Sequence, residues 1–463
     1  MTVEERIKGR KIGIIGMARS GIAAALLAKR FGGTPFVSDS ARSELVTAKT
    51  TRLQQEGIPY ETEGHTEKLL GSDFIIISPG VPPNIEIVKQ AKARGIPIFS
   101  ELEFAFWVCR GQVVGITGSN GKTTTTTLVG EIFKAAGRET FVCGNIGRPF
   151  ADIADRVSES GVAVVEVSTF QLEAIEDFRP RVAAILNLTP DHLDRHGSFE
   201  NYKKMKYRIS ENQTADDYLL INRDDPEMKG AEISSRAKRL AFSIEDNSET
   251  ATFVRDGYLC SRHEGRETKI IKVGEINIPG EHNLQNAATA VAIAALFDIA
   301  PEVTAKTLRE FPGVEHRLEK VGSVAGVNFV NDSKATNVDS VCVALKSMTR
   351  PVYLIAGGRD KGAGYEPIVK FGKGKVKGVI VIGEAREKIF NALGQVFPTQ
   401  FAESLEKAVH RAFELALPGE TVLLSPGCSS FDMFENFEHR GRVFKATVES
   451  LKKNKKKNET FPN

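Results

Sequence analysis

The segment most informative about the architecture is Val113-Val-Gly-Ile-Thr-Gly-Ser-Asn-Gly-Lys-Thr-Thr124, in which an apolar run passes through a glycine-rich loop into a run of threonines. Gly118 and Gly121 allow backbone N–H groups to turn toward an anion, and Lys122 adds a positive charge. Thr123 or Thr124 offers a hydroxyl to Mg²⁺. The segment therefore predicts a strand, a phosphate-binding loop and a helix. It departs from the strict pattern G-x-x-x-x-G-K-[ST], because its first glycine is Gly115 rather than residue 116.

Length and composition describe an ordinary globular protein. At roughly 100 to 200 residues per domain, 463 residues predict about three domains. The hydrophobic fraction of 41% and the charged fraction of 26% exclude a disordered or fibrous chain. The net charge of +3 is small, and the basic residues are spread out except for the lysines near the C-terminus. We therefore expect no nucleic-acid partner. The lysine-rich end is either a solvated terminus or a contact for acidic partners.

The cysteines and the apolar runs bear on the compartment. Five widely spaced cysteines without a C-x-x-C pair argue against a disulfide framework or a zinc site, and they favour a reducing environment. The N-terminus has no apolar leader, and no apolar run is long enough to span a bilayer. We expect a cytoplasmic protein that does not insert into membranes.

The first third of the chain opens with a β-α-β pattern. Lys11–Ile15 and Pro35–Asp39 are predicted strands, and a wide loop that begins at Gly16 leads into a helix between them. Asp39 at the end of the second strand could hold a ribose hydroxyl, although the glycines do not match G-x-G-x-x-G. The pattern predicts a nucleotide-sized ligand at the carboxyl ends of the strands, in a domain that ends near Trp107.

The middle third places single polar residues at informative positions. Val162–Glu166 is an apolar strand that ends on a carboxylate, which is either a Mg²⁺ ligand or a solvent-facing strand end. His192 follows another such strand, as a metal ligand or as a residue that caps a loop. Lys203, Lys204 and Lys206 by themselves indicate only a solvated helix face.

The last third contains three further apolar strands that run into polar loops, at residues 329–336, 353–361 and 422–430. Parallel α/β sheets bind ligands at the carboxyl ends of their strands. The fold class that follows is α/β with three domains: a Rossmann-like N-terminal domain, a central P-loop ATPase domain with a mostly parallel sheet, and a Rossmann-like C-terminal domain.

Six ordered motifs resemble those of the ATP-dependent Mur ligases of peptidoglycan synthesis. They are Gly118-Ser-Asn-Gly-Lys-Thr-Thr124, Glu166-Val-Ser-Thr-Phe-Gln171, Asp191-His-Leu-Asp194, His282-Asn283 with Asn286, His316-Arg317, and Asn331-Asp-Ser-Lys-Ala-Thr-Asn337. Ser78-Pro-Gly-Val-Pro82, the last of those motifs and Ser425–Phe437 are most similar to the branch that adds D-glutamate to UDP-N-acetylmuramoyl-L-alanine. The resemblance covers the chain apart from the lysine tail.

This resemblance implies domains at 1–107 for the UDP substrate, 108–312 for ATP and 313–463 for the amino acid. The residues it assigns to the UDP substrate are Gly16, Ala18, Arg19, Ser20, Asp39, Ser40, Asn145 and His192. ATP is assigned Gly118, Ser119, Asn120, Gly121, Lys122, Thr123, Thr124, Asn283, Asn286, Arg317 and Asp332. D-Glutamate is assigned Lys334, Thr336, Lys361, Ser430 and Phe437. The catalytic set is Lys122, Glu166, His192, Lys206 and Lys334.

The resemblance also implies ATP, two Mg²⁺ ions, and CO₂ carried as a carbamate on Lys206. The metal ligands are then Thr123, Glu166, His192 and the Lys206 carbamate, since a carbamate gives a lysine the charge of a carboxylate. The implied reaction forms an amide through an acyl phosphate. We also expect the protein to be a monomer. Gly427 and Arg359 depart from other members and concern fine specificity only.

Two alternatives stay open. One is a related ligase that adds L-alanine, a diamino acid or, on folate, glutamate. The other is a nucleotide-binding switch that hydrolyses ATP without making an amide. The choice of D over L rests on the resemblance, because side-chain types do not determine chirality.

Overall fold

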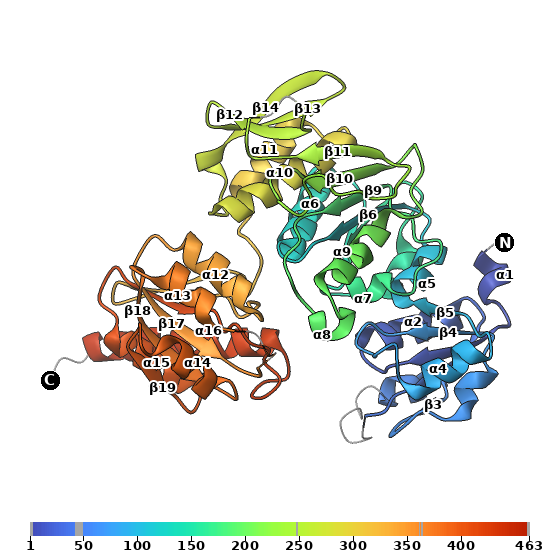
Figure 1. Ribbon diagram of the computed structural model, residues 1–463, viewed down its shortest axis with the longest axis horizontal. Helices are drawn as coiled ribbons and strands as arrows, with labels where there is room; N and C mark the ends of the chain where they lie inside the picture. Colours follow the sequence, from blue (N-terminus) through green and yellow to red (C-terminus); the bar gives the residue numbers. More distant parts are fainter. Residues whose placement is uncertain (1–2, 42–49, 247–248, 361, 363, 461–463) are drawn as a thin grey trace. The chain divides into compact units, whose positions relative to one another are not determined.

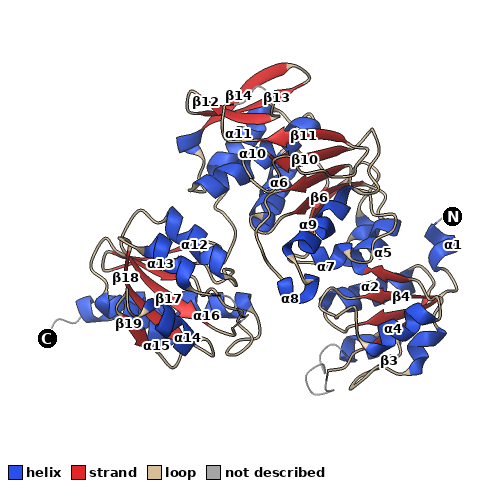
Figure 2. Cartoon of the chain, in the orientation of Figure 1, coloured by secondary structure: helices blue, strands red, loops and turns tan. Residues whose placement is uncertain are grey.

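The computed structural model describes residues 3–41, 50–246, 249–360, 362 and 364–460, and contains three β-sheets (Figures 1 and 2). The residues form two compact units, of which the first comprises the chain up to residue 277 with 283–311, and the second 278–282 with 312–463. The three-domain α/β fold class is confirmed by these sheets, which are mostly parallel. None of the described helices is long and apolar enough to cross a membrane.

The N-terminal sheet has the strand order β3-β2-β1-β4-β5, and all of its pairs are parallel. Ile12 and Ile14 of β1 pack on α2 in one core, whereas Ile15 packs with α4 in another. The alternation follows from the two-residue period of a strand that is covered on both faces. The elements are α1 (Val3–Ile7), β1 (Lys11–Ile15), α2 (Arg19–Arg30), β2 (Thr34–Ser38), β3 (Tyr60–Glu61), η1 (Glu67–Gly71), β4 (Phe74–Ile77), α4 (Glu86–Ala93), β5 (Ile98–Ser100) and α5 (Glu101–Val108).

The central sheet has the order β14-β13-β12-β11-β10-β9-β6-β8-β7. The pairs from β7 to β12 are parallel, and β12, β13 and β14 form an antiparallel extension. Its elements are β6 (Gln112–Thr117), α6 (Lys122–Ala135), β7 (Thr140–Gly144), η2 (Phe150–Asp152), η3 (Ala154–Arg156), β8 (Val162–Glu166), α7 (Thr169–Leu172), β9 (Val182–Ile185), α8 (Leu193–His196), α9 (Phe199–Tyr207), η4 (Arg208–Ser210), β10 (Tyr218–Asn222), β11 (Lys238–Phe242), β12 (Thr252–Arg255), β13 (Tyr258–His263), β14 (Arg266–Lys272), η5 (Val273–Glu275), α10 (Glu281–Leu296) and α11 (Pro301–Glu310).

The C-terminal sheet has the order β15-β16-β20-β17-β18-β19, and only β15 is antiparallel to its neighbour. Helices α12, α13 and α14 pack on one face and α15 and α16 on the other, as the two core clusters on either side of β17 show. Its elements are β15 (Glu319–Val324), β16 (Val327–Asn331), α12 (Val338–Ser347), β17 (Val352–Gly357), α13 (Glu366–Gly372), β18 (Val376–Ile382), α14 (Arg386–Leu393), β19 (Thr399–Phe401), α15 (Leu405–Leu415), β20 (Thr421–Leu424) and α16 (Phe437–Thr460).

Candidate active site

The glycine-rich loop connects β6 to α6 as the sequence predicts. Gly118 has φ 153° and Gly121, which caps the helix, has φ 85°. A side chain at position 121 would place its Cβ 2.4 Å from Oδ1 of Asn286 on α10. Glycine is therefore required here both for the left-handed backbone and for the close approach of α10. The loop turns the N-terminus of a 14-residue helix toward the carboxyl edge of the sheet, where an anion would be stabilised.

Lys122 folds back over this loop. Its Nζ donates to the carbonyl oxygens of Gly118 at 2.7 Å and of Ser119 at 2.8 Å. The ammonium group therefore lies at the mouth of the loop, where the sequence places the charge that would meet a phosphate.

Glu166 ends β8 and is only 1% exposed, so the solvent-facing alternative for this residue is wrong. Its Oε2 accepts a hydrogen bond from the Thr123 hydroxyl at 2.7 Å, and its Oε1 accepts one from Nδ2 of Asn145 at 2.9 Å. The structure thus brings a buried carboxylate, a hydroxyl and an amide together beside the phosphate loop.

Lys206 is 2% exposed, although the lysines around it lie on a solvated helix face. Its Nζ donates to the Gly118 carbonyl oxygen at 2.9 Å and lies 4.6 Å from the centre of the Tyr202 ring. Burial, followed by the charge of Lys122, lowers the pKa of Lys206 well below its usual value. Lys203 instead pairs with Glu200 and Glu227. The solvated-face interpretation is therefore wrong for Lys206, whose contacts across the fold could not be seen from sequence.

His192 has φ 51° and caps the short helix α8, with its ring 4.8 Å from that of Phe170. Arg195 on the same helix is not among the site residues that the sequence predicted. Arg195 pairs with Glu173 at 2.5 Å and donates to the carbonyl oxygen of Val81 at 3.1 Å. The loop that carries His192 is thus tied to the Ser78–Pro82 segment, and the signal that could have revealed this was an arginine within the Asp191–His196 stretch.

A cavity of about 530 Å³ lies within the first unit. Its lining residues come from loops of the N-terminal sheet and of the central sheet. Its lining includes seven of the residues assigned to the UDP substrate, but not His192. The seven are Gly16, Ala18, Arg19, Ser20, Asp39, Ser40 and Asn145. Sequence analysis did not assign His65 or Ile85, which also line the cavity. The space and its location fit a nucleotide-sized ligand.

Asp39, which the sequence predicts to hold a ribose hydroxyl, also bonds to the backbone of the loops around it. Its carboxylate accepts hydrogen bonds from the backbone N–H groups of Met17 at 2.5 Å and of Ala41 at 2.8 Å. The side chain therefore holds the Gly16 loop against the end of β2, which sets the shape of the cavity wall.

Of the two asparagines on α10 that are assigned to ATP, Asn286 lies next to Gly121 of the phosphate loop. Asn286 is 3% exposed, accepts from the Thr125 hydroxyl at 3.1 Å and donates to Oδ1 of Asn283 at 3.2 Å. The bond between Thr125 and Asn286 joins α6 to α10, and the bond between the two asparagines orients the Asn286 amide beside the loop.

In the second unit, several residues assigned to ATP and the amino acid follow the neighbouring strands β16 and β20. Asp332 follows β16 and is buried, which raises its pKa to about 7, and its carboxylate accepts from the Ser425 hydroxyl at 2.8 Å and from the backbone N–H of Leu318 at 3.2 Å. Nζ of Lys334 lies 5.2 Å from the centre of the Phe437 ring. Ser430 is 2% exposed and Thr336 is half-buried. Lys361 lies outside the described residues.

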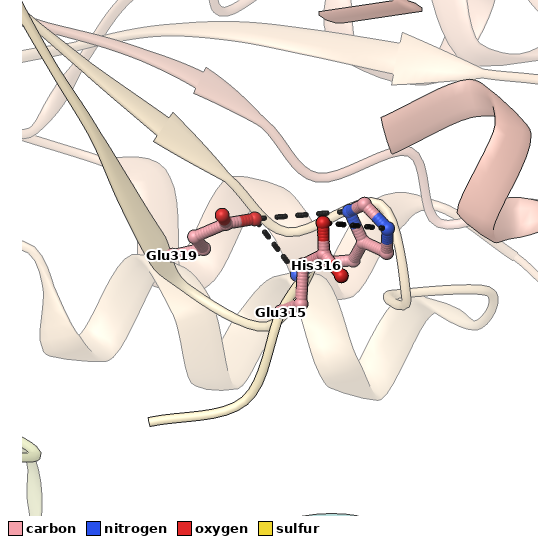
Figure 3. Close-up of side chains that lie close together, drawn as sticks. All are labelled: Glu315, His316 and Glu319. Atoms are coloured by element: carbon pink, nitrogen blue, oxygen red, sulfur yellow. Dashed lines mark hydrogen bonds and ion pairs between the residues drawn. The ribbon is translucent and has the colours of Figure 1, made fainter. Parts of the chain in front are cut away.

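Arg317 is held between two residues with left-handed backbones, His316 at φ 65° and Leu318 at φ 45°. Figure 3 shows His316 with Glu315 and Glu319. Glu319 accepts from the backbone N–H of His316 at 2.9 Å. Lys445 donates to Glu315 at 2.9 Å and to Glu319 at 2.6 Å. An ammonium group thus already satisfies the two carboxylates, and the cluster stabilises a strained turn rather than offering a metal site.

Three family models match separate parts of the chain. The MurD N-terminal domain matches residues 11–87, the Mur ligase middle domain matches 116–294, and the Mur ligase glutamate ligase domain matches 316–428.

Two named relatives are similar over their full length. The UDP-N-acetylmuramoylalanine–D-glutamate ligase of Chloroherpeton thalassium is 43% identical, over 97% of this chain and 100% of the relative. The protein of the same name from Thermoanaerobacter pseudethanolicus is 41% identical, over 96% and 100%. Among solved structures, the MurF ligase of Thermotoga maritima in complex with ADP matches with a TM-score of 0.60 at 16% identity, over 96% of this chain and 97% of that one. The chain belongs to the Mur ligase family, and within it to the group of UDP-N-acetylmuramoylalanine–D-glutamate ligases.

Proposed function

We propose that this protein joins D-glutamate to UDP-N-acetylmuramoyl-L-alanine in peptidoglycan precursor synthesis, and converts ATP to ADP and phosphate in doing so. The full-length relatives carry this activity in their names. The observation that supports the chemistry most directly is the buried cluster at the phosphate loop, where Thr123 and Asn145 both donate to Glu166.

The reaction must first activate a carboxylate. The alanyl carboxylate attacks the γ-phosphorus of ATP, so that an oxygen–phosphorus bond forms while the bond to the β,γ-bridging oxygen breaks and ADP leaves. The amine of D-glutamate then attacks the acyl carbon, the bond to phosphate breaks, and the amine proton passes to solvent. Two anions meet in the first step, so Lys122 and Arg317 are assigned to reduce their repulsion.

Two of the donors fit Mg²⁺, since the hydroxyl of Thr123 and the carboxylate of Glu166 are hard oxygen ligands 2.7 Å apart. The assignment of His192 rests on the resemblance. Bound Mg²⁺ supplies positive charge to the phosphates. Two ions, with these three residues and a modified Lys206 as ligands, are our proposal.

The environment of Lys206 fits a carbamate. Addition of CO₂ requires a neutral amine, and burial lowers the pKa of Lys206 well below its usual value. The carbamate would supply an anionic oxygen where an ammonium would repel a metal. In the unmodified lysine, Nζ donates to the Gly118 carbonyl and so helps to shape the loop.

The remaining assignments are proposals of the same kind. They are the domain limits 1–107, 108–312 and 313–463, the UDP-substrate residues that line the cavity, the D-glutamate residues of the second unit, a monomeric state and a cytoplasmic location.

Mass spectrometry of the products tests the proposal. The protein is incubated with ATP, Mg²⁺ and UDP-N-acetylmuramoyl-L-alanine. Each reaction also contains one amino acid: D-glutamate, L-glutamate, D-aspartate, L-alanine or diaminopimelate. We expect a new amide with D-glutamate, little with D-aspartate and none with L-alanine or diaminopimelate. A better yield with L-glutamate or the diamino acid would place the chain in another branch. Release of ADP without an amide would instead support the nucleotide switch, for which the cavity in the first unit has no evident use.

A further inference from the structure

Arg440 is among the largest fully buried side chains of the described residues, with a relative exposure of 0%. It lies on α16, one turn after Phe437. No carboxylate lies within ion-pair distance of its guanidinium in the part of the chain that the structure describes. A buried charge without a close counter-ion is costly to fold, and an apolar side chain of similar size is often neutral or better for stability. Packing alone therefore does not account for an arginine at this buried position.

All three nitrogens of the guanidinium donate to oxygens of two loops. Nε donates to the Ser333 hydroxyl at 3.0 Å and Nη2 to the Ser333 carbonyl at 2.8 Å. Nη1 and Nη2 each donate to the Cys428 carbonyl at 3.2 Å, and Nη1 reaches the Ser429 carbonyl at 3.4 Å. The rigid, planar fork fixes these oxygens relative to one another, which a lysine cannot do.

The bonded residues directly precede those assigned to the amino acid. Ser333 comes before Lys334, and Ser429 comes before Ser430. The Ser333 hydroxyl also donates to the carbonyl oxygen of Phe437 at 2.8 Å. One guanidinium therefore connects the three segments that carry Lys334, Ser430 and Phe437.

A fourth segment is built around the same group. Gly358 follows β17, and a Cβ there would lie 3.2 Å from Nη1 of Arg440 and 2.3 Å from the Ser429 carbonyl oxygen. The backbone N–H of Arg359 donates to that Ser429 carbonyl at 2.9 Å. Because Gly358 has no side chain, the guanidinium fits beside it. Through the Ser429 carbonyl, the loop after β17 is connected to the loops that follow β16 and β20.

We propose that Arg440 is a positioning residue for the amino-acid substrate: it holds the loops of Lys334, Ser430 and Phe437 in one geometry and places a buried positive charge behind them. This inference rests on the proposed function for the identity of the substrate. A dicarboxylic amino acid gains from both effects, because its two anionic ends must be held apart and its charge is attracted at a distance through a poorly screened interior.

The kinetic test compares Arg440→Lys, which keeps the charge but loses the fork, with Arg442→Lys, an exposed arginine on the same helix. For Arg440→Lys we expect the KM for D-glutamate to rise by about tenfold or more, with the KM values for ATP and the nucleotide substrate changing by no more than about threefold. Asp332 should keep its place because Ser425 and Leu318 hold it independently. Arg442→Lys should leave all three values unchanged. An equal rise in all three, or no rise, would overturn the proposal.

Amide hydrogen exchange of the ligand-free protein tests the positioning without reference to the reaction. Arg440→Lys should speed exchange at residues 331–337 and 427–437 and leave the strands β17 and β18 unchanged. Arg440→Met, an apolar replacement, should show the same pattern if it folds. Uniformly faster exchange across the C-terminal sheet would mean that Arg440 only stabilises the fold. If the wild-type enzyme rejects D-glutamate, the proposed function fails while the exchange pattern still decides the role of Arg440.

Discussion

Lys206 and Arg440 are buried basic residues in different compact units, and each donates to backbone carbonyl oxygens of loops that are proposed to bind ligands. Burial lowers the pKa of both, to well below the usual value for Lys206 and to about 10 for Arg440. The amine of Lys206 therefore loses its proton more readily than an exposed lysine does, whereas the guanidinium of Arg440 stays charged. Burial therefore makes the neutral form of a lysine more accessible, whereas a buried arginine keeps its charge and its planar set of donors.

The largest effect is expected for a cation that meets the phosphate directly. Lys122→Ala should lower kcat by about 10³-fold, which corresponds to about 4 kcal/mol in the barrier, because Lys122 lies at the mouth of the phosphate loop. Binding of UDP-N-acetylmuramoyl-L-alanine, measured by calorimetry, should be unchanged. Lys134→Ala, at an exposed position of α6, is the matched control. Turnover within tenfold of wild type would contradict the phosphate-loop assignment.

Replacing Lys206 by arginine tests whether a buried cation that cannot react with CO₂ can do the work of the lysine. Lys206→Arg keeps a positive charge that cannot carry CO₂, and Lys206→Ala removes it; both should lower kcat by about 10²-fold or more. Acetate should partly restore Lys206→Ala but not Lys206→Arg, since only the smaller side chain leaves room for a carboxylate. Steady-state kinetics with and without acetate provide the measurement.

Lys204→Ala is the control for this pair of variants, because Lys204 is exposed on the same helix. It should change kcat by less than about twofold. If Lys206→Arg proved fully active, Lys206 would act as a simple cation and the contrast with Arg440 would disappear.

A smaller effect is expected for an arginine that has a carboxylate partner. Arg195 pairs with Glu173 and donates to Val81 at the rim of the cavity. Arg195→Gln should raise the KM for the nucleotide substrate by about fivefold and leave the KM for D-glutamate unchanged, the reverse of the pattern for Arg440. A larger effect on D-glutamate would show that the two arginines do not serve separate substrates.

The last prediction concerns a buried group of the opposite charge, and its effect appears in stability rather than activity. Glu101 is fully buried at the start of α5, where its Oε1 accepts from the backbone N–H of Ala151 at 2.6 Å. Burial raises its pKa from 4.5 to about 7. The folded state then binds more protons than the unfolded state between these values, so stability should fall as pH rises from 4.5 to 7.

Glu101→Gln keeps the acceptor for Ala151 and removes the ionisation. It should flatten this pH dependence and raise the free energy of unfolding at pH 8 by about 3 kcal/mol. Urea unfolding at several pH values measures it, with the exposed Glu159→Gln as control. If the stability of Glu101→Gln fell between pH 5 and 7 as much as that of the wild type and of Glu159→Gln, the assignment to Glu101 would be contradicted.

Sequence was sufficient wherever a local pattern carried the information. The alternation of apolar runs with glycine-rich or polar loops predicted the three α/β domains, and the spacing of Gly118, Gly121 and Lys122 predicted the turn from β6 into α6. These features depend on backbone geometry and hydrophobic period, which neighbouring residues determine.

Tertiary structure alone decided which polar residues are buried and what they contact. Lys203, Lys204 and Lys206 look alike in the sequence, yet only Lys206 is inserted against the carbonyl of Gly118, 88 positions away. Arg440 stands in an ordinary amphipathic helix, and its role depends on Ser333, 107 positions away. Burial and the pKa shifts that follow from it are set by long-range packing, because desolvation depends on every chain segment around a group and not on its neighbours in sequence.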